Sequence, residues 1–421
     1  MPAYGLIPFI LMLGAIAVLP LVAEHWWEHN RNKGIVSAIL GVPVGVWFLM
    51  HDAGHVASVG LEYVSFLALL GSLFVISGGI LLRGDLRATP LTNTKFLALG
   101  AVLASFMGTT GAAMLLIRPV LRTNSERTYR VHTVVIFIFI VANCGGLLTP
   151  LGDPPLFMGY LRGVPFSWTF GLWQEWLLVN AALLGIFYLW DTRIWAREPG
   201  EAKRLDETRV EPLSVVGHIN FPLLVGVVLV VAFGAHLPVL VDTGHATFGL
   251  RELAMFGLAG ASLALTPKAA REGNAFTFGP IIEVAVLFFG IFLTMIPALV
   301  YLQENGTSFG LTTPAQYFWT TGSLSAFLDN APTYIVFLEL ARVTVPDAAG
   351  VVGIPAEVLV AISTGAVFMG AVTYIGNGPN FMVKAIAESS GVKMPSFFGY
   401  MAYSCAILIP LFVLCTVVFF R

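Results

Sequence analysis

Two acidic residues lie in otherwise apolar sequence and are the strongest candidates for chemistry. The first, Asp329, follows Ser-Ala-Phe-Leu and precedes Asn330-Ala-Pro332. A carboxylate at the centre of a membrane helix costs about 3 kcal/mol on insertion scales, so such a residue usually faces a cavity or a partner. Asn330 adds a neutral oxygen, and Pro332 cannot donate a backbone hydrogen bond and so leaves a carbonyl free. These oxygens together are typical of a site for a hard cation. The alternative is that Asp329 only caps a helix that begins beside Pro332.

The second acid, Asp153, lies in a helix-breaking run of Gly, Pro and small polar residues. Asn143 and Thr149 precede it, Gly152 adjoins it, and Pro154 follows. Glycine permits unusual backbone angles and close approach of other groups. This composition indicates a second place where a membrane helix is interrupted. The alternative is a surface turn in which Asp153 caps a helix that starts at Pro154.

Both breaks occur twice in the chain. The segment Thr149–Met158 returns as Thr373–Met382, and Asp153 is matched there by its amide, Asn377. An earlier pair, Ser105–Ala112 and Ser325–Pro332, lies at nearly the same offset. Interruptions at corresponding places in two apolar halves are the best sequence pointer to a transporter's binding site.

The composition is that of a membrane protein. The chain is 57% hydrophobic and 11% charged, whereas soluble domains carry about 25% charged residues. The net charge of −2 gives no bulk field that would attract nucleic acid. Three cysteines, an odd number, lie in apolar stretches without metal-ligand spacing, so they predict packing residues and no disulfide framework.

The hydropathy pattern predicts an all-α fold with about eleven to thirteen membrane-embedded segments, because a span needs about 20 apolar residues or fewer where it is broken. No Lys or Arg precedes the first apolar run, so we expect it to be a membrane helix and not a signal peptide. The candidate segments are Tyr4–Val22, Ile35–Met50, Leu61–Leu82, Phe96–Ile117, Val131–Leu148, Phe170–Trp190, Phe221–Leu240, Leu253–Leu265, Ile281–Tyr301, Ala315–Leu340, Val351–Val372 and Phe397–Phe420. The sizeable polar stretch between them, Asp191 to Gly217, is expected to be a linker.

Other polar residues are weaker candidates. Glu283, at the edge of a predicted span, is an interfacial acid or a proton carrier, and Glu339 is expected to pair with Arg342 three residues later. His51 and His55 have the spacing of a metal-binding pair on a helix, but the other histidines, including His132, His218, His236 and His245, are scattered singly. Loop histidines at the membrane interface are the preferred interpretation. The sequence has no nucleophile elbow, Walker loop, zincin motif or dinucleotide fingerprint, which favours secondary transport over enzymatic chemistry.

The quoted motifs resemble those of NhaD-like sodium/proton antiporters. The resemblance is carried by residues 104–119, 143–155 and 327–332 and extends over most of the chain. These antiporters belong to the ion-transporter superfamily, which also contains citrate, dicarboxylate and arsenite carriers, and the most similar group is also labelled as citrate transporters. One departure weakens a citrate interpretation: carboxylate carriers have Ser-Asn-Thr hairpin tips, whereas this chain has Gly108-Thr-Thr-Gly and Leu328-Asp-Asn-Ala.

The resemblance implies a scaffold and two inverted repeats, each with a re-entrant hairpin and a broken helix, assembled as a homodimer. The hairpin tips and broken helices would meet at the binding site. The site residues that the resemblance implies are Thr109, Thr110, Gly111, Asn143, Thr149, Gly152, Asp153, Asp329, Asn330, Pro332, Thr373, Gly376, Asn377, Pro379 and Asn380. The implied division is scaffold helices at 1–92, a first transport repeat at 93–190, a polar linker at 191–218, further scaffold helices at 219–302 and a second transport repeat at 303–421.

We therefore expect a secondary antiporter that exchanges sodium, or lithium, for protons in a bilayer, of the bacterial inner-membrane type. Its coupling ions would be sodium and protons, with no cofactor, no structural metal and no nucleic-acid partner. Cation and proton would compete for Asp329, with Asp153 as the second carboxylate. The first alternative is a sodium- or proton-coupled citrate or dicarboxylate symporter, in which helix N-termini after Gly152 and Gly376 meet the anion. The second is a membrane enzyme built around His51 and His55.

Overall fold

The computed structural model describes residues 2–244 and 246–421, which places His245 outside the described residues. The α-helices are Ile7–Val22 (α1), Glu24–Trp27 (α2), Asn30–His51 (α3), Ala53–Ser77 (α4), Pro90–Met107 (α5), Thr109–Thr123 (α6), Val131–Ile140 (α7), Pro154–Leu161 (α8), Trp173–Arg197 (α9), Gly200–Thr208 (α10), Asn220–Ala232 (α11), Leu250–Leu265 (α12), Lys268–Gly273 (α13), Gly279–Asn305 (α14), Pro314–Ser325 (α15), Asn330–Thr344 (α16), Ala356–Met369 (α17), Gly378–Ser389 (α18) and Phe397–Phe419 (α19).

Short 3-10 helices and two small hairpins complete the structure. The 3-10 segments are Ala3–Leu6 (η1), Cys144–Leu148 (η2), Phe166–Leu172 (η3), Gly234–His236 (η4), Gly306–Phe309 (η5) and Gly370–Val372 (η6). The strands are Leu81–Asp85 (β1), which pairs antiparallel with Glu211–Val216 (β2), and Val239–Asp242 (β3), which pairs antiparallel with Thr247–Gly249 (β4).

The helices confirm an all-α membrane protein with several spans. Among the described residues, seven helical segments are long and apolar enough to cross a membrane: Ala3–Val22, Asn30–His51, Ala53–Ser77, Val131–Leu148, Phe166–Arg197, Gly279–Phe309 and Phe397–Phe419. The sequence predicted more segments because several of its candidates form shorter pieces. The candidate Phe96–Ile117 lies within two helices, α5 and α6, that meet at Gly108, whose φ of 80° is in the region that favours glycine. The candidate Ala315–Leu340 likewise divides into α15 and α16.

Six helices form a scaffold group, which we define as α1, α3, α4, α11, α12 and α14. The longest of them, α14, packs against α1, α3 and α4, while α12 packs against α4 and α11. The start of α14 is tied to the start of α3 by a hydrogen bond from Asn30 Nδ2 to the Gly279 carbonyl at 3.2 Å. The exposed surfaces of these helices carry large apolar side chains such as Ile39, Trp47 and Phe256, as expected for a surface in contact with lipid.

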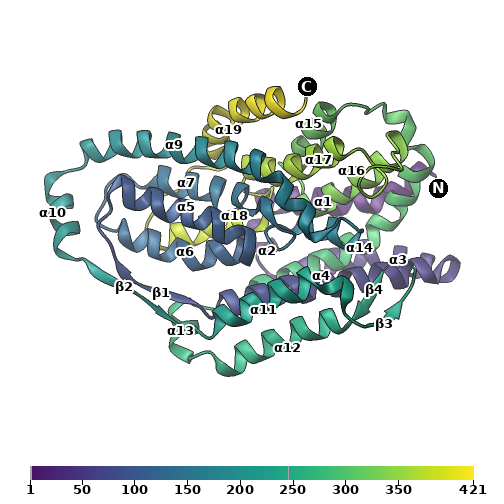
Figure 1. Cartoon of the computed structure of the whole chain (residues 1–421), viewed down its shortest axis with the longest axis horizontal. Helices are drawn as coiled ribbons and strands as arrows, with labels where there is room; N and C mark the ends of the chain where they lie inside the picture. Colours follow the sequence, from purple (N-terminus) through teal and green to yellow (C-terminus); the bar gives the residue numbers. More distant parts are fainter. Residues whose placement is uncertain (1, 245) are drawn as a thin grey trace.

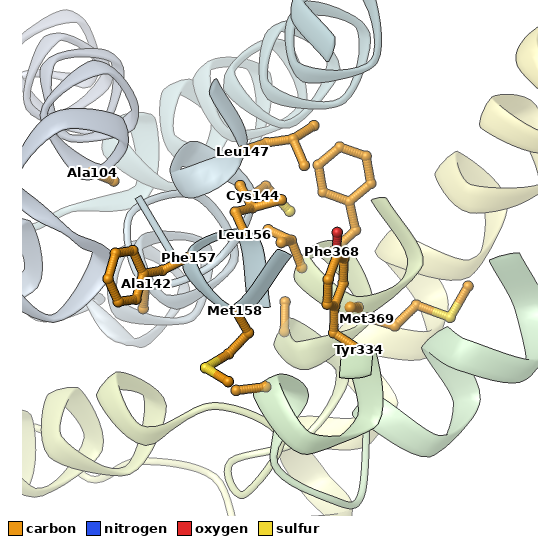
Figure 2. Packing of buried hydrophobic residues seen from close by; sticks show 14 of the residues in the cluster. Ala104, Ala142, Cys144, Leu147, Leu156, Phe157, Met158, Tyr334, Phe368 and Met369 are labelled. Carbon is orange, nitrogen blue, oxygen red and sulfur yellow. The ribbon is translucent and has the colours of Figure 1, made fainter. Parts of the chain in front are cut away.

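The two broken segments lie among the remaining helices. Figure 1 shows α5, α6, α7 and α18 gathered on one side and α15, α16 and α17 together on the other, although α18 belongs to the C-terminal half of the chain. Helix α18 packs against α6 and α7 of the N-terminal half, and α8 packs against α16 and α17 of the C-terminal half. Figure 2 shows part of this packing, where Leu156 and Met158 of α8 lie near Tyr334 and Phe368. Each half therefore contributes to the surroundings of the other half's break.

The two breaks have matching backbones. In the first, η2 leads to extended Thr149 and then to Asp153 (φ −145°, ψ 144°), directly before α8. In the second, η6 leads to extended Thr373 and then to Asn377 (φ −151°, ψ 139°), directly before α18. Proline near the start of both helices suits a position where the backbone N–H has no helical acceptor. The repeated sequence thus produces a repeated local fold, while the inverted relation of whole repeats and the homodimer stay predictions.

The polar stretch after Trp190 is more ordered than a linker would require. Helix α9 continues through Asp191 to Arg197, and the stretch then forms α10 and β2. Asp191 does not end the helix because its carboxylate accepts two hydrogen bonds from Arg127, from Nη1 at 3.0 Å and from Nη2 at 2.5 Å, and lies 2.8 Å from His132 Nε2. A charge neutralised in this way is compatible with a buried helix position.

Candidate functional site

Asp153 lies at the meeting point of both breaks and both hairpin tips. Its side chain is 1% exposed. Oδ1 accepts hydrogen bonds from Thr109 Oγ1 at 2.8 Å and from Asn377 Nδ2 at 3.0 Å, and Oδ2 accepts one from Asn330 Nδ2 at 2.5 Å. Four predicted site residues, from four different segments, are therefore in direct contact.

These contacts decide whether Asp153 caps α8, an alternative that the sequence left open. Asp153 occupies the N-cap position of α8, but its carboxylate makes no capping hydrogen bond to that helix. It faces the hairpin tips instead. The interpretation of Asp153 as a turn-forming cap is wrong, because the second half of the chain supplies competing hydrogen-bond donors that a local pattern does not reveal.

An asparagine cluster extends the site away from Asp153. Asn377 Nδ2 also lies 3.3 Å from Asn143 Oδ1, and Asn143 Nδ2 donates to Asn380 Oδ1 at 2.7 Å. Asn380 Nδ2 in turn donates to the carbonyls of Gly370 and Thr373 at 2.8 and 2.9 Å. The two carbonyls at this helix break therefore have hydrogen-bond donors, as buried backbone at membrane depth requires.

Two threonines hold the breaks against the hairpins in the same way. Thr149 Oγ1 donates to the Ser105 carbonyl, and Thr373 Oγ1 donates to the Ala326 carbonyl. Each hydroxyl also accepts the backbone N–H two residues later, from Leu151 and Ile375 respectively. Thr149 and Thr373 thus position the site and do not reach Asp153 themselves. Gly152 contributes through its carbonyl, which accepts from the Thr109 N–H at 2.8 Å.

Asp329 has the capping role that the sequence offered as its alternative. Its Oδ1 accepts a hydrogen bond from the Ala331 N–H at 3.1 Å, in the first turn of α16. It is half-buried, and its side chain makes no ion pair within the residues described. Pro332 lies buried in the same first turn. Asp329 therefore caps a helix and also borders open space.

That space is a cavity of about 420 Å³ between the broken segments and the scaffold group. On the broken-segment side it is lined by Gly108, Thr109, Thr110, Gly111, Leu151, Gly152, Asp329, Asn377, Gly378 and Pro379, and on the scaffold side by Trp27, Glu28, Lys33, Leu73, Phe74, Glu283 and Phe288, among others. Thr109 and Asn377 both line the cavity and bond Asp153, so they form the boundary between the cavity and the buried carboxylate.

Among the described residues, the Asp153 carboxylate has no basic partner, and the neighbouring Asn330 Oδ1 has no hydrogen-bond donor. All three hydrogen-bond donors to Asp153 are neutral, and none of the ion pairs among the described residues includes it. Asn330 is 1% exposed, and its Oδ1 is buried without a hydrogen-bond partner. Burial of a carboxylate without a basic partner is costly when it is charged, so a proton or a cation at Asp153 would lower this cost. The neighbouring Asn330 oxygen is of the type that a hard cation prefers.

A separate ion network lies at the far ends of α8 and α16. Arg162 Nη2 donates to Glu62 Oε2 and Arg162 Nη1 to Glu339 Oε1, each at 2.9 Å, and Arg342 Nη1 donates to the same Glu339 oxygen at 2.8 Å. The predicted Glu339–Arg342 pair is therefore confirmed, and it belongs to a network that joins scaffold helix α4 to both halves.

The histidine candidates lie outside this site. His51 is the last residue of α3 and stacks on Trp47, and His55 lies in the first turn of α4, so these two residues are at helix ends and not in a loop. Over 2–244 and 246–421, no group of three or more His, Cys, Asp or Glu side chains could hold a metal ion. Cys144 and Cys415 are buried, as packing residues would be, while Cys405 is exposed.

Some residues of the ion network and of the cavity lining were not among the candidates predicted from the sequence. Arg162 and Glu62 had no local motif, since they lie 100 residues apart. Lys33, which lines the cavity and pairs with Glu283 at 2.6 Å, was likewise absent from the candidates. The available signal was a lysine just before the apolar run Ile35–Met50, but the sequence does not show that this lysine is 4% exposed in the fold.

Comparison with known families agrees with this architecture. No curated protein matches the chain. A family model described as "Putative citrate transport" matches residues 1–420. The match covers nearly the whole chain. The chain is thus an integral membrane protein of secondary-transporter type and belongs to the CitMHS_2 family.

Proposed function

We propose that this protein exchanges sodium, or lithium, for protons across the membrane. The observation that carries the proposal is the state of Asp153, a buried carboxylate with three neutral donors and no basic partner among the residues that the structure describes. Such a group is neutral with a proton and neutralised by a bound cation, and it cannot hold both. Competition for one carboxylate is the simplest physical basis for exchange.

The surrounding groups suit a small cation. Asn330 Oδ1 has no donor to displace, and rotation of the Thr109 hydroxyl would turn its oxygen lone pairs towards an ion beside Asp153. Asp329, at the cavity wall, supplies a second carboxylate on the route to Asp153. We propose that Asp329 receives the cation from the cavity and that Asp153 forms the inner position. In both positions carboxylate, amide and hydroxyl oxygens replace water around the ion.

A second candidate, cation-coupled citrate or dicarboxylate uptake, is favoured by a specific feature. Helix α6 begins at Thr109 and α18 at Gly378, and residues of both first turns line the cavity. Helix N-termini attract anions. Against this, three acids, Glu28, Glu283 and Asp329, line the cavity with Lys33 as the base, and Lys33 is engaged by Glu283. A polyanion such as citrate would be repelled by these negative charges.

Purified protein in sealed proteoliposomes tests the choice. An imposed sodium gradient, without any carboxylate present, is expected to drive proton movement that a pH-sensitive dye inside the vesicles reports. Parallel vesicles receive labelled citrate with the same gradient. Proton flux without citrate supports exchange. Sodium-dependent citrate uptake, with no proton flux in its absence, would replace the exchange proposal with symport.

A further inference from the structure

One ion pair on the scaffold side of the cavity has no role in the site described above. Lys33, in the first turn of α3, is the base among the described residues that line the cavity. Its Nζ lies 2.6 Å from Oε1 of Glu283, on the first turns of α14. The lysine side chain is 5% exposed, whereas that of Glu283 is 42% exposed. The pair therefore presents mainly its carboxylate to the open space.

We propose that the Lys33–Glu283 pair sets the charge selectivity of the cavity, which rests on the proposed cation exchange. Glu283 cancels the field of Lys33, so Glu28 and Asp329 leave the cavity with an excess of negative charge. A cleft lined by one sign of charge concentrates ions of the opposite sign. The pair thereby determines whether the route to Asp329 favours a cation or an anion, without contacting the ion at Asp153.

The geometry gives Lys33 no alternative neutralising partner among the described residues. Its Nζ lies 6.0 Å from the centre of the Trp27 ring, and the acid paired with it is Glu283. The start of α3 is held to that of α14 by the bond from Asn30 to the Gly279 carbonyl and by the packing of the two helices, so the backbone positions that carry Lys33 and Glu283 stay close together. Removing the Glu283 charge would leave a positive charge at the cavity wall.

Substitutions on the two sides of the pair are expected to act in opposite directions. Glu283→Gln exposes the charge of Lys33 and is expected to raise the sodium concentration for half-maximal proton flux about three- to tenfold at low ionic strength. Lys33→Gln frees the Glu283 carboxylate and is expected to lower that concentration by a similar factor. The double variant is expected to return towards the wild-type value, and Lys33→Arg, which keeps the charge, to stay close to it.

A structural role alone would not produce this sign pattern. If the pair only holds α3 against α14, both single variants would impair flux and lower the unfolding temperature together. That result, or the absence of a shift in either variant, would overturn the inference. Glu357→Gln, an exposed acid in the first turn of α17, is the matched control and is expected to leave the sodium dependence unchanged. The shifts are expected to shrink at high salt, where surface charges are screened.

The same variants separate this inference from the proposed function. Wild-type protein that moves no protons in response to sodium would reject the exchange proposal itself. If that protein instead takes up citrate, with Glu283→Gln improving uptake and Lys33→Gln weakening it, the pair still selects charge but in an anion carrier. Sodium-driven proton flux with equal responses of both variants would retain the exchange proposal and reject the role of the pair.

Discussion

Asn330 Nδ2 donates a hydrogen bond to Asp153 Oδ2 at 2.5 Å, across 177 residues of sequence. The bond connects the hairpin tip of the second half to the break of the first. It also fixes the orientation of the Asn330 amide, because a carboxylate accepts only from the nitrogen end. Asn330 Oδ1 is consequently left without a partner. The donor that stabilises Asp153 thus presents an unused acceptor beside it.

Asp153→Asn is expected to fold and to lose exchange. The introduced amide would present either its nitrogen or its oxygen to Asn330, and rotation of the Asn330 amide by a half turn would pair its free Oδ1 with the introduced N–H donor. The hydrogen bonds can therefore be re-formed, whereas the titratable charge is gone. Sodium-driven proton flux in proteoliposomes is expected to fall to the level of empty vesicles. Size-exclusion profile and unfolding temperature are expected to stay near wild type.

Asp347→Asn provides the control for that experiment, because Asp347 is a half-buried loop residue that does not line the cavity and whose Oδ1 accepts from the Ala349 N–H. It is expected to retain flux. Near-normal flux in Asp153→Asn would remove Asp153 from the mechanism, whatever the stability of the variant.

The broken segments were predictable because their signal is local. Gly152, Pro154 and Pro379 disrupt helices by their own chemistry, and Asp153 costs free energy in any apolar segment. The repeat of Thr149–Met158 then identified the second break without any knowledge of contacts. The structure places Asp153 and Asn377 in direct contact at 3.0 Å, as a shared site required.

The ion-pair partners of the charged residues could not be predicted from a local pattern. Lys33 and Glu283 lie far apart in the chain, and nothing near either residue specifies the other. Asp191 was interpreted as the start of a linker because the sequence shows its charge but not the guanidinium of Arg127 that neutralises it. Burial of a charge depends on long-range pairing, which a single sequence does not contain.

Arg162→Met is expected to destabilise the protein strongly. The arginine binds Glu62 and Glu339, which are 5% and 4% exposed, and its removal leaves Glu62 without its basic partner. Breaking a buried pair in this way costs about 3–5 kcal/mol. The unfolding temperature in detergent, followed by intrinsic tryptophan fluorescence, is expected to drop by several degrees or more.

An exposed pair supplies the comparison for Arg162. Arg87 and Glu207 are bonded, and their side chains are 54% and 55% exposed. Arg87→Met is expected to change stability by no more than about 1 kcal/mol, as is usual for surface pairs. Equal unfolding temperatures for the two variants would show that the network joining α4, α8 and α16 contributes no more than a surface pair.

A pH-dependent contribution to stability is expected at β1, outside the membrane-spanning segments. Burial, together with repulsion from Glu126 and Asp206, raises the pKa of Asp85 to about 6. The unfolded chain therefore loses this proton near pH ~4, whereas the folded protein keeps it until about pH 6. Asp85 consequently destabilises the fold as pH rises between these values, and the full penalty is present above about pH 6.

Asp85→Asn is expected to remove that penalty. Its unfolding temperature is expected to exceed that of the wild type at about pH 7–8, and the difference is expected to disappear near pH ~4. A constant difference over this whole pH range would assign the effect to packing and not to titration of Asp85.

Substitutions of Asp329 can distinguish a role in helix capping from a role in transport. Its carboxylate caps α16 through the Ala331 N–H and also lines the cavity, so simple loss of function in an alanine variant would not tell the two roles apart. Asparagine caps helices almost as well as aspartate but carries no charge. Asp329→Asn is therefore expected to keep its unfolding temperature and to lose sodium-driven proton flux.

Asp329→Glu keeps the titratable group on a longer side chain, and we expect residual flux with a higher half-saturating sodium concentration. Ser396→Ala, which removes a cap from α19 at a residue that does not line the cavity, is expected to lower stability slightly and to retain flux. Normal exchange by Asp329→Asn would leave Asp329 as a cap alone and confine the chemistry to Asp153.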